Sequence, residues 1–153
     1  MKEGWQNNNF DRMLSHMKAV NRKSIEVGIV ESKKHPSKGR VYETAQIYQW
    51  MEEGTSDGRV PKRPTLRPTM KRFKPLAAPL VNNLMYSSVK SGNYMGALND
   101  AGRAYAKLVK HAIMSLSHPA LSPYTIANRV NKGTSNPLVD TKLLHDSIGH
   151  KVV

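Results

Sequence analysis

The sequence contains no cysteine, and this absence excludes several kinds of chemistry. Without thiols the chain has no disulfide, no thiolate metal site and no cysteine nucleophile. Its six histidines form no His-x-x-x-His or His-x-His pair, so a metal site would need ligands that converge from distant positions. We therefore expect neither a metal nor another cofactor.

Long apolar runs are also missing. No stretch approaches the roughly 18 apolar residues of a membrane span, so we expect no membrane partner. Residues 1–10 lack the charged and then apolar pattern of a secretory signal, which predicts that the protein stays in the cytoplasm where it is made.

Acidic residues are few, and they show no catalytic arrangement. The only adjacent pair among the eleven acids is Glu52 and Glu53, and neighbours on a helix do not face one another. We interpret this pair as a solvated helix end. No phosphate-binding loop, nucleophile elbow or kinase signature occurs, so we expect no enzymatic activity.

Basic residues are abundant, and they are clustered. The chain has 24 Lys and Arg and a formal net charge of +13. The clusters fall in two segments with Pro or Gly punctuation, which predicts loops that meet nucleic acid or an acidic protein surface; a solvated basic surface is the alternative. The candidate contact residues are Lys33, Lys34, Lys38 and Arg40 in the first segment and Arg59, Lys62, Arg63, Arg67, Lys71 and Arg72 in the second.

Two of these cations lie between prolines, which should hold the chain extended. Arg63 and Arg67 would then form bidentate pairs with carboxylate or phosphate. Only one aromatic residue, Phe73, occurs in residues 59–74, so we do not expect sequence-specific recognition of nucleic acid.

The chain length and the apolar spacing predict one α+β domain, residues 1–153. A small antiparallel sheet, made of an early strand (25–30) and a terminal strand (148–153), should pack against one long and several short helices. The long main helix is residues 94–116, and shorter helices are expected after Asn7 to Asn9, over 42–53 and 80–92, after Ser122, and after Asp140 or Thr141. Five prolines in residues 54–79 predict a Pro-rich basic arm or loop instead of a helix.

Two segments carry recognisable motifs. The first reads Glu53-Gly-Thr and then Val60-Pro-Lys-Arg-Pro-Thr-Leu-Arg-Pro68; the second reads Ser122-Pro-Tyr-Thr-Ile126 and then Pro137-Leu-Val-Asp-Thr-Lys-Leu-Leu-His-Asp-Ser-Ile148. Both resemble, in the same order, motifs of the tailed-bacteriophage virion morphogenesis family, the neck and tail-completion proteins that join head to tail. The motif positions are Gly54, Thr55, Pro61, Pro64, Leu66, Pro68, Ser122, Thr125, Ile126, Leu138, Asp140, Thr141, Leu143, Ser147 and Ile148.

The sequence departs from the family pattern at two motif positions. The family usually has Gly where this chain has Lys142, and Phe where it has Thr65. The second change should weaken an apolar anchor and leave Leu66 to make that contact alone. We interpret Asp140 and Thr141 as caps of the following helical turn instead of acid and base residues.

The resemblance implies a structural virion protein of a tailed phage. Such a protein is made in the host cytoplasm and is a subunit of a ring, a hexamer, at the head-tail junction, with the segment around Arg63 and Arg67 helping to position the core within the ring. Its partners would be further copies of itself, head-completion or connector proteins, and tail-tube or tail-terminator proteins, with non-specific contact to packaged DNA. The alternatives are a tail terminator that caps the tail tube and a small basic nucleic-acid-binding module.

Overall fold

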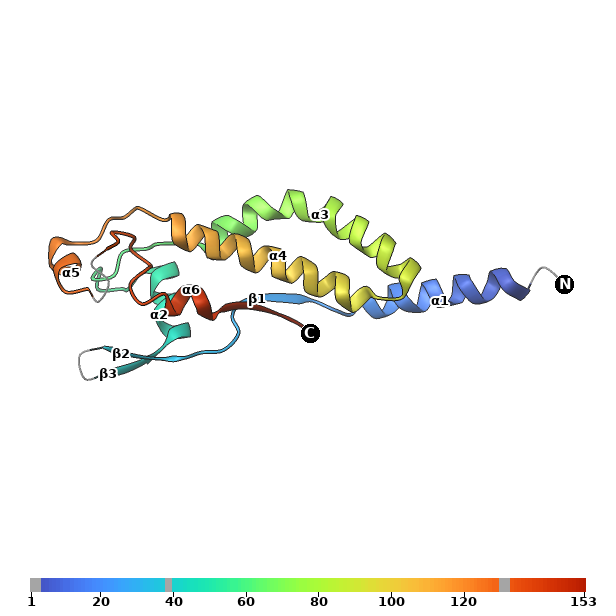
Figure 1. Ribbon diagram of the computed structural model, residues 1–153, viewed down its shortest axis with the longest axis horizontal. Helices are drawn as coiled ribbons and strands as arrows, with labels where there is room; N and C mark the ends of the chain where they lie inside the picture. The colour runs from blue at the N-terminus through green and yellow to red at the C-terminus, as the bar shows by residue number, and fades with distance from the viewer. Residues whose placement is uncertain (1–3, 38–39, 130–132) are drawn as a thin grey trace.

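The computed structural model describes residues 4–37, 40–129 and 133–153. Two long antiparallel helices, α3 (Leu66–Ser91) and α4 (Tyr94–Ser115), form the middle of the molecule (Figure 1). Gly92 ends α3 in the left-handed conformation, and the Asn93 side chain accepts a hydrogen bond from the Gly96 amide at 3.1 Å to begin α4. Both helix boundaries were predicted from these residue types, and the main helix is confirmed.

Helix α3 corrects the prediction of a Pro-rich arm. Residues 66–79 are helical, and only residues 54–65 follow an irregular path. Pro68 lies in the first turn, where a backbone N–H would have no acceptor within the helix, so its absence costs nothing there. Pro75 and Pro79 lie inside the helix. Each internal proline removes one hydrogen bond, and packing along α4 offsets the loss; Phe73, for example, stacks on Tyr105 with ring centroids 5.1 Å apart.

The two ends of the chain meet in a small antiparallel sheet, as predicted. Strand β1 (Ile25–Ile29) pairs with β4 (Ile148–Val152), with Ile25 opposite Val152. Helix α4 packs so closely on this sheet that a side chain would not fit at Gly102. A Cβ there would lie 2.4 Å from the ring of His150. The sheet and the long helix confirm the α+β class.

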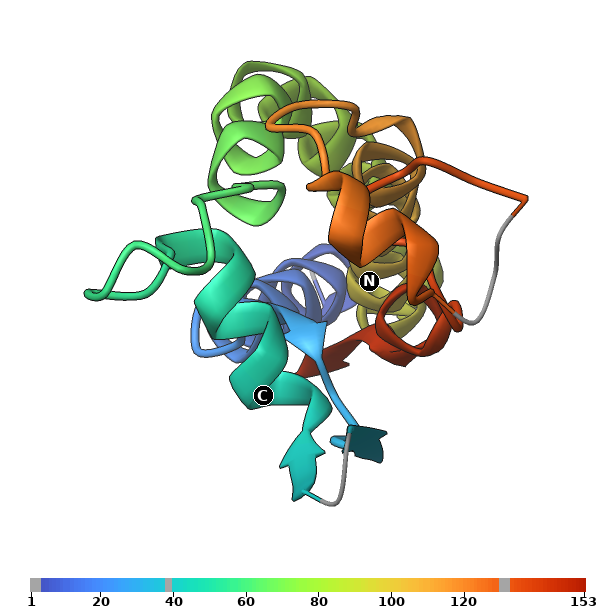
Figure 2. The ribbon, with the colours of Figure 1, turned by 90° about the vertical axis from the view of Figure 1, so that its left-hand side faces the viewer.

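A second hairpin replaces the first predicted basic loop. Strands β2 (Lys34–Ser37) and β3 (Arg40–Glu43) are antiparallel, and the hairpin projects beyond helix α2 (Thr44–Glu53) in Figure 2. Thr44 fixes its base, since the backbone N–H and the hydroxyl of this buried residue both donate to the Lys33 carbonyl, at 2.9 and 2.5 Å. Tyr42 packs edge-on against Trp50, with ring centroids 5.2 Å apart.

Helix α1 (Gly4–Val20) begins earlier than predicted, so the asparagines expected to cap it lie inside the helix. It extends from one end of the body, and the β2–β3 hairpin lies at the opposite end (Figure 1). Across the described residues, every helix is too short or too polar to cross a membrane.

The core lies between α4, the β1–β4 sheet and the C-terminal segment. Val109 and Ile113 of α4 are fully buried, and Leu138, Leu144 and Ile148 pack against them. Two of the motif residues named from the sequence, Leu138 and Ile148, therefore belong to the core.

Candidate interface site

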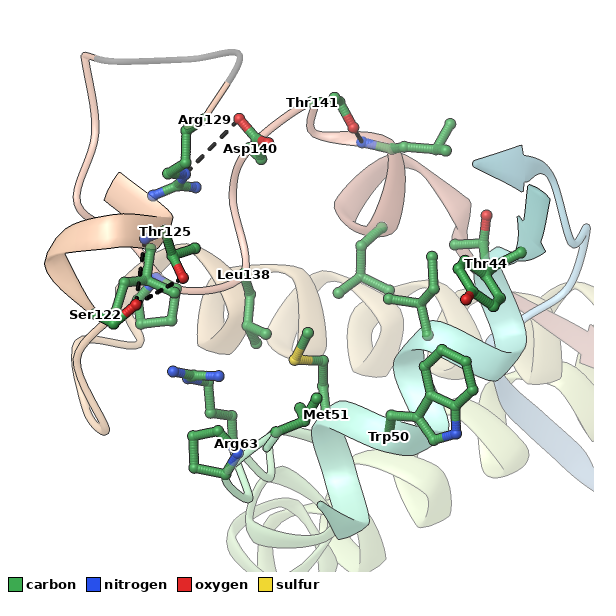
Figure 3. A pocket seen from close by; sticks show the side chains of 18 of the residues that line it. Thr44, Trp50, Met51, Arg63, Ser122, Thr125, Arg129, Leu138, Asp140 and Thr141 are labelled. Carbon is green, nitrogen blue, oxygen red and sulfur yellow. Dashed lines mark hydrogen bonds and ion pairs between the residues drawn. The ribbon is translucent and has the colours of Figure 1, made fainter. Parts of the chain in front are cut away.

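Both motif segments line one groove of about 600 Å³, which we call the motif groove. Helix α2 forms one wall, and the opposite wall comes from the segment that holds α5 (Pro123–Ala127) and α6 (Leu143–Ser147). Met51 and Leu138 point toward one another across it (Figure 3). The lining residues of the first motif segment are Arg59, Val60, Pro61 and Arg63; those of the second are Ser122, Thr125, Pro137, Leu138, Asp140, Thr141, Lys142, Leu143 and Leu144.

Arg63 ties the first motif segment to the chain after α4. Its Nε donates to the Pro119 carbonyl at 3.0 Å and its Nη2 to the Ala120 carbonyl at 3.2 Å, and only 4% of the residue is exposed. Burial lowers the pKa of the guanidinium from its usual value. Arg63 is therefore not the exposed contact cation that the sequence predicted, because it is buried and two of its nitrogens bond to carbonyls inside the molecule.

Arg129 holds the second motif segment in place in a similar way, and the sequence analysis did not identify it. Nη1 donates to the Thr134 carbonyl at 2.9 Å, Nη2 donates to the Val139 carbonyl, and Nε lies 3.7 Å from the Asp140 carboxylate. Thr141 has the predicted capping role, because its hydroxyl accepts from the Leu143 amide at 3.4 Å. No spacing in the sequence singles out Arg129, since its main partners are backbone carbonyls.

Asn136 is a second residue that the sequence analysis missed. Its side-chain amide donates to the carbonyls of Ile113 and Met114 at 3.0 and 2.6 Å, and its oxygen accepts from the Leu138 amide at 2.9 Å. These bonds satisfy the end of α4 and hold Leu138 against the core. A polar residue just before Pro137 was the available signal for such a turn.

Glu52 joins α2 to the start of α3, which corrects its interpretation as a solvated helix end. One carboxylate oxygen accepts from the Thr65 amide (2.5 Å), the Thr65 hydroxyl (2.8 Å) and the Leu66 amide (2.7 Å). Thr65 is buried, so it supplies a polar anchor in place of the expected apolar one, while Leu66 packs on the core. Glu53 is exposed, as expected, and pairs with Arg67 at 3.2 Å.

Tyr48 extends this network from α2. Its hydroxyl lies 2.9 Å from the Thr65 hydroxyl, whose single hydrogen goes to Glu52, so Tyr48 must be the donor. Burial raises the pKa of Tyr48 well above its usual range, which keeps that proton in place.

The remaining residues of the first motif make a tight turn. Gly54 ends α2 with a φ of 74°, and a Cβ there would lie 2.9 Å from the Lys62 side chain. The Thr55 hydroxyl donates to the Asp57 carboxylate at 2.6 Å and accepts from the Val60 amide at 3.0 Å. The turn places Val60 and Pro61 on the motif groove.

Lys142 departs from the glycine that the resemblance predicts at this position, and its backbone has a conformation that favours glycine. Lys142 has a φ of 60°, and it is the one residue other than glycine with a positive φ among the described ranges. The left-handed conformation lets the chain turn into α6, where the Ser147 hydroxyl donates to the Leu143 carbonyl at 2.7 Å.

Replacing Lys142 with Gly should therefore stabilise the protein. We expect the free energy of unfolding to rise by about 1 kcal/mol, since a side chain in this conformation costs about that much. Urea unfolding followed by circular dichroism measures it. Lys107→Gly, at an exposed position within α4, is the matched control and should lower the same quantity by about 1 kcal/mol. A loss of stability in Lys142→Gly would contradict the argument.

Exposed apolar side chains flank the motif groove. Ser122 caps α5 as predicted, accepting from the Thr125 amide at 3.2 Å, yet no residue of α5 is buried. Tyr124 is 68% exposed, and Ile126 is also exposed. On the β2–β3 hairpin Val41 is 63% exposed, next in sequence to Tyr42, which lines the groove. Large apolar side chains in such positions are typical of a surface that another molecule covers.

The ten predicted contact cations divide into groups. Lys33, Lys34, Lys62, Lys71 and Arg72 are exposed, as a contact role requires. Arg59 and Arg67 are exposed but paired with Asp57 and Glu53, at 3.3 and 3.2 Å. Arg63 is buried, Lys38 lies outside the described residues, and the side chain of Arg40 also lies outside them.

The groove offers little acid or base chemistry. Among its described lining residues Asp140 is the only carboxylate, and it faces Arg129. Within residues 4–37, 40–129 and 133–153, no three His, Asp or Glu side chains gather closely enough to hold a metal ion. Comparison of the chain with protein-family models, with curated proteins and with solved structures found no match.

Proposed function

We propose that this protein is a structural virion protein of a tailed phage, a subunit of a ring at the head-tail junction that joins the connector to the tail. The observation that carries the proposal is the convergence of both motif segments on one groove. Residues about sixty positions apart in sequence meet there, and two buried arginines hold the walls through backbone carbonyls. Such a fixed shape suits an assembly contact.

The partner in this contact is a second copy of the chain. The exposed apolar residues beside the groove would be covered by that copy, and a contact between different faces of neighbouring copies closes into a ring. Copies with a net charge of +13 repel one another, so added salt should strengthen assembly by screening the repulsion. A tail terminator would use the same groove, and a ring in that position is the second candidate.

Changing Tyr124 to Asp tests the contact. We expect the variant to remain monomeric at protein concentrations where the parent protein forms rings, because the charge would be buried at the contact. Sedimentation velocity in about 0.5 M salt, where repulsion is screened, measures the association.

The matched control is Tyr86→Asp. Tyr86 lies in the second half of α3 and is 78% exposed, so the same chemical change should leave association intact. Equal association of both variants would remove the groove from the contact, and a parent protein that stays monomeric alone and is absent from purified virions would overturn the proposal.

A further inference from the structure

A second groove lies between α3, α4 and the segment that follows α4, and we call it the α3–α4 groove. It has a volume of about 500 Å³ and shares no lining residue with the motif groove. Its polar lining residues are Thr65, Thr69, Arg72, His111, Ser115, Ser117 and His118, and none of the described lining residues carries a carboxylate.

Arg72 is the principal charge of this groove. Arg59, Arg67 and Arg103 are exposed cations that each pair with a carboxylate, at 3.1 to 3.3 Å. Arg72 is exposed and makes no ion pair with any residue in the described ranges. Its guanidinium donors are thus available to an anion from outside.

A further cation extends the charge along α4. Lys71, next to Arg72 on α3, lies instead on the hollow that holds Glu52 and Glu53. On α4 the exposed Lys107 lies four residues before His111, so their side chains are neighbours on one helix face. Cations on two helices, Arg72 on α3 and Lys107 on α4, suit a polymer of phosphates better than one free phosphate ion.

The wall formed by the segment after α4 is held in place by the body. Arg63 donates to the carbonyls of Pro119 and Ala120, directly after His118. The Ser117 hydroxyl and Nδ1 of His118 lie 2.9 Å apart. These contacts keep polar groups at the rim without a ligand, which lowers the entropy lost on binding.

We propose that the α3–α4 groove binds the sugar-phosphate backbone of duplex DNA without regard to sequence. Guanidinium, ammonium and hydroxyl groups match phosphate oxygens, and Phe73 in the groove is stacked on Tyr105 instead of being placed to stack on a base. Binding of this kind needs no assembled ring, so it is separate from the proposed contact at the motif groove.

The test measures binding of a fluorescent duplex of about 30 base pairs and mixed sequence across a salt series. The double variant Arg72→Ala/Lys107→Ala should bind roughly tenfold or more weakly at about 0.1 M salt, and its plot of log K against log salt should lose a slope of about 1.8, or about 0.9 for each phosphate contact. The protein is kept dilute, so that ring assembly does not contribute.

The control is Arg59→Ala/Arg103→Ala, which removes the same net charge from two exposed arginines that already pair with carboxylates. It should change affinity by no more than about threefold and keep the parent slope. Equal losses in the two double variants would mean that only net charge matters, and would overturn the site. Failure of the parent protein to bind duplex DNA at low salt, or tighter binding of the single strand than of the duplex, would overturn it as well.

Discussion

Arg129→Met should lower the free energy of unfolding by about 3–5 kcal/mol, the range expected when a buried and fully bonded charge is removed. Only 4% of the Arg129 side chain is exposed, and its guanidinium serves two backbone carbonyls and one carboxylate. Methionine fills much of the volume but donates nothing, so the Thr134 and Val139 carbonyls lose their partner. Val139 is itself buried, so water cannot easily replace the lost bond.

Urea unfolding followed by far-ultraviolet circular dichroism measures this change, and Arg59→Met is the matched control. Arg59 is exposed and pairs with Asp57 at the surface, so the control should change stability by less than about 0.5 kcal/mol. Similar values for the two variants would mean that the Arg129 bonds add nothing to stability.

Asp140→Asn separates two contributions to stability: the ion pair between Asp140 and Arg129, and the hydrogen bonds from Arg129 to the carbonyls. The Asp140 side chain is 37% exposed and lies 3.7 Å from Arg129, so water can screen the pair. We expect a loss of about 1 kcal/mol, well below that of Arg129→Met. A larger loss from Asp140→Asn would make the ion pair, and not the carbonyl bonds, the main support of this segment.

Elements with a local cause were predictable from the sequence. Gly92 and Asn93 separate the two long helices, Ser122 caps α5, and the alternating apolar residues of β1 and β4 form the sheet. In each case the responsible residues lie within a few positions of the feature they produce.

Features that depend on distant partners were not predictable. The prolines of α3 suggested an arm, because the sequence does not reveal that α4 packs against this helix, as Tyr105 does on Phe73. Arginine side chains are mostly exposed in proteins. Arg63 and Arg129 are nevertheless buried, and both bond to backbone carbonyls. For Arg63 those carbonyls lie more than fifty positions away, where no spacing rule reaches.

The motif groove is an intermediate case. The resemblance grouped its two segments from sequence alone, and the preference for Gly at the position of Lys142 has a conformational reason in the positive φ found there. The order of motifs along the chain, however, does not say that they meet in space. The packing of α2 against the C-terminal segment brings them together.

Glu52→Ala should cost about 3–4 kcal/mol of unfolding free energy, because one carboxylate oxygen holds three donors at the junction of α2 and α3. Two of those donors are backbone amides at the start of α3, where a negative charge also interacts favourably with the helix dipole. Alanine leaves these amides and the buried Thr65 hydroxyl without their acceptor. Tyr48, which donates to Thr65, would lose its fixed partner as well.

Two variants make this prediction specific to the carboxylate. Glu52→Gln keeps an acceptor oxygen but places an NH₂ group where the second carboxylate oxygen is buried without a hydrogen-bond partner, so we expect an intermediate loss of about 1–2 kcal/mol. Glu53→Ala, next in sequence and paired only at the surface, should stay within about 0.5 kcal/mol of the parent. Urea unfolding of the three variants gives the order. If Glu52→Ala and Glu53→Ala unfold at the same urea concentration, then Glu52 does not hold α3 to α2.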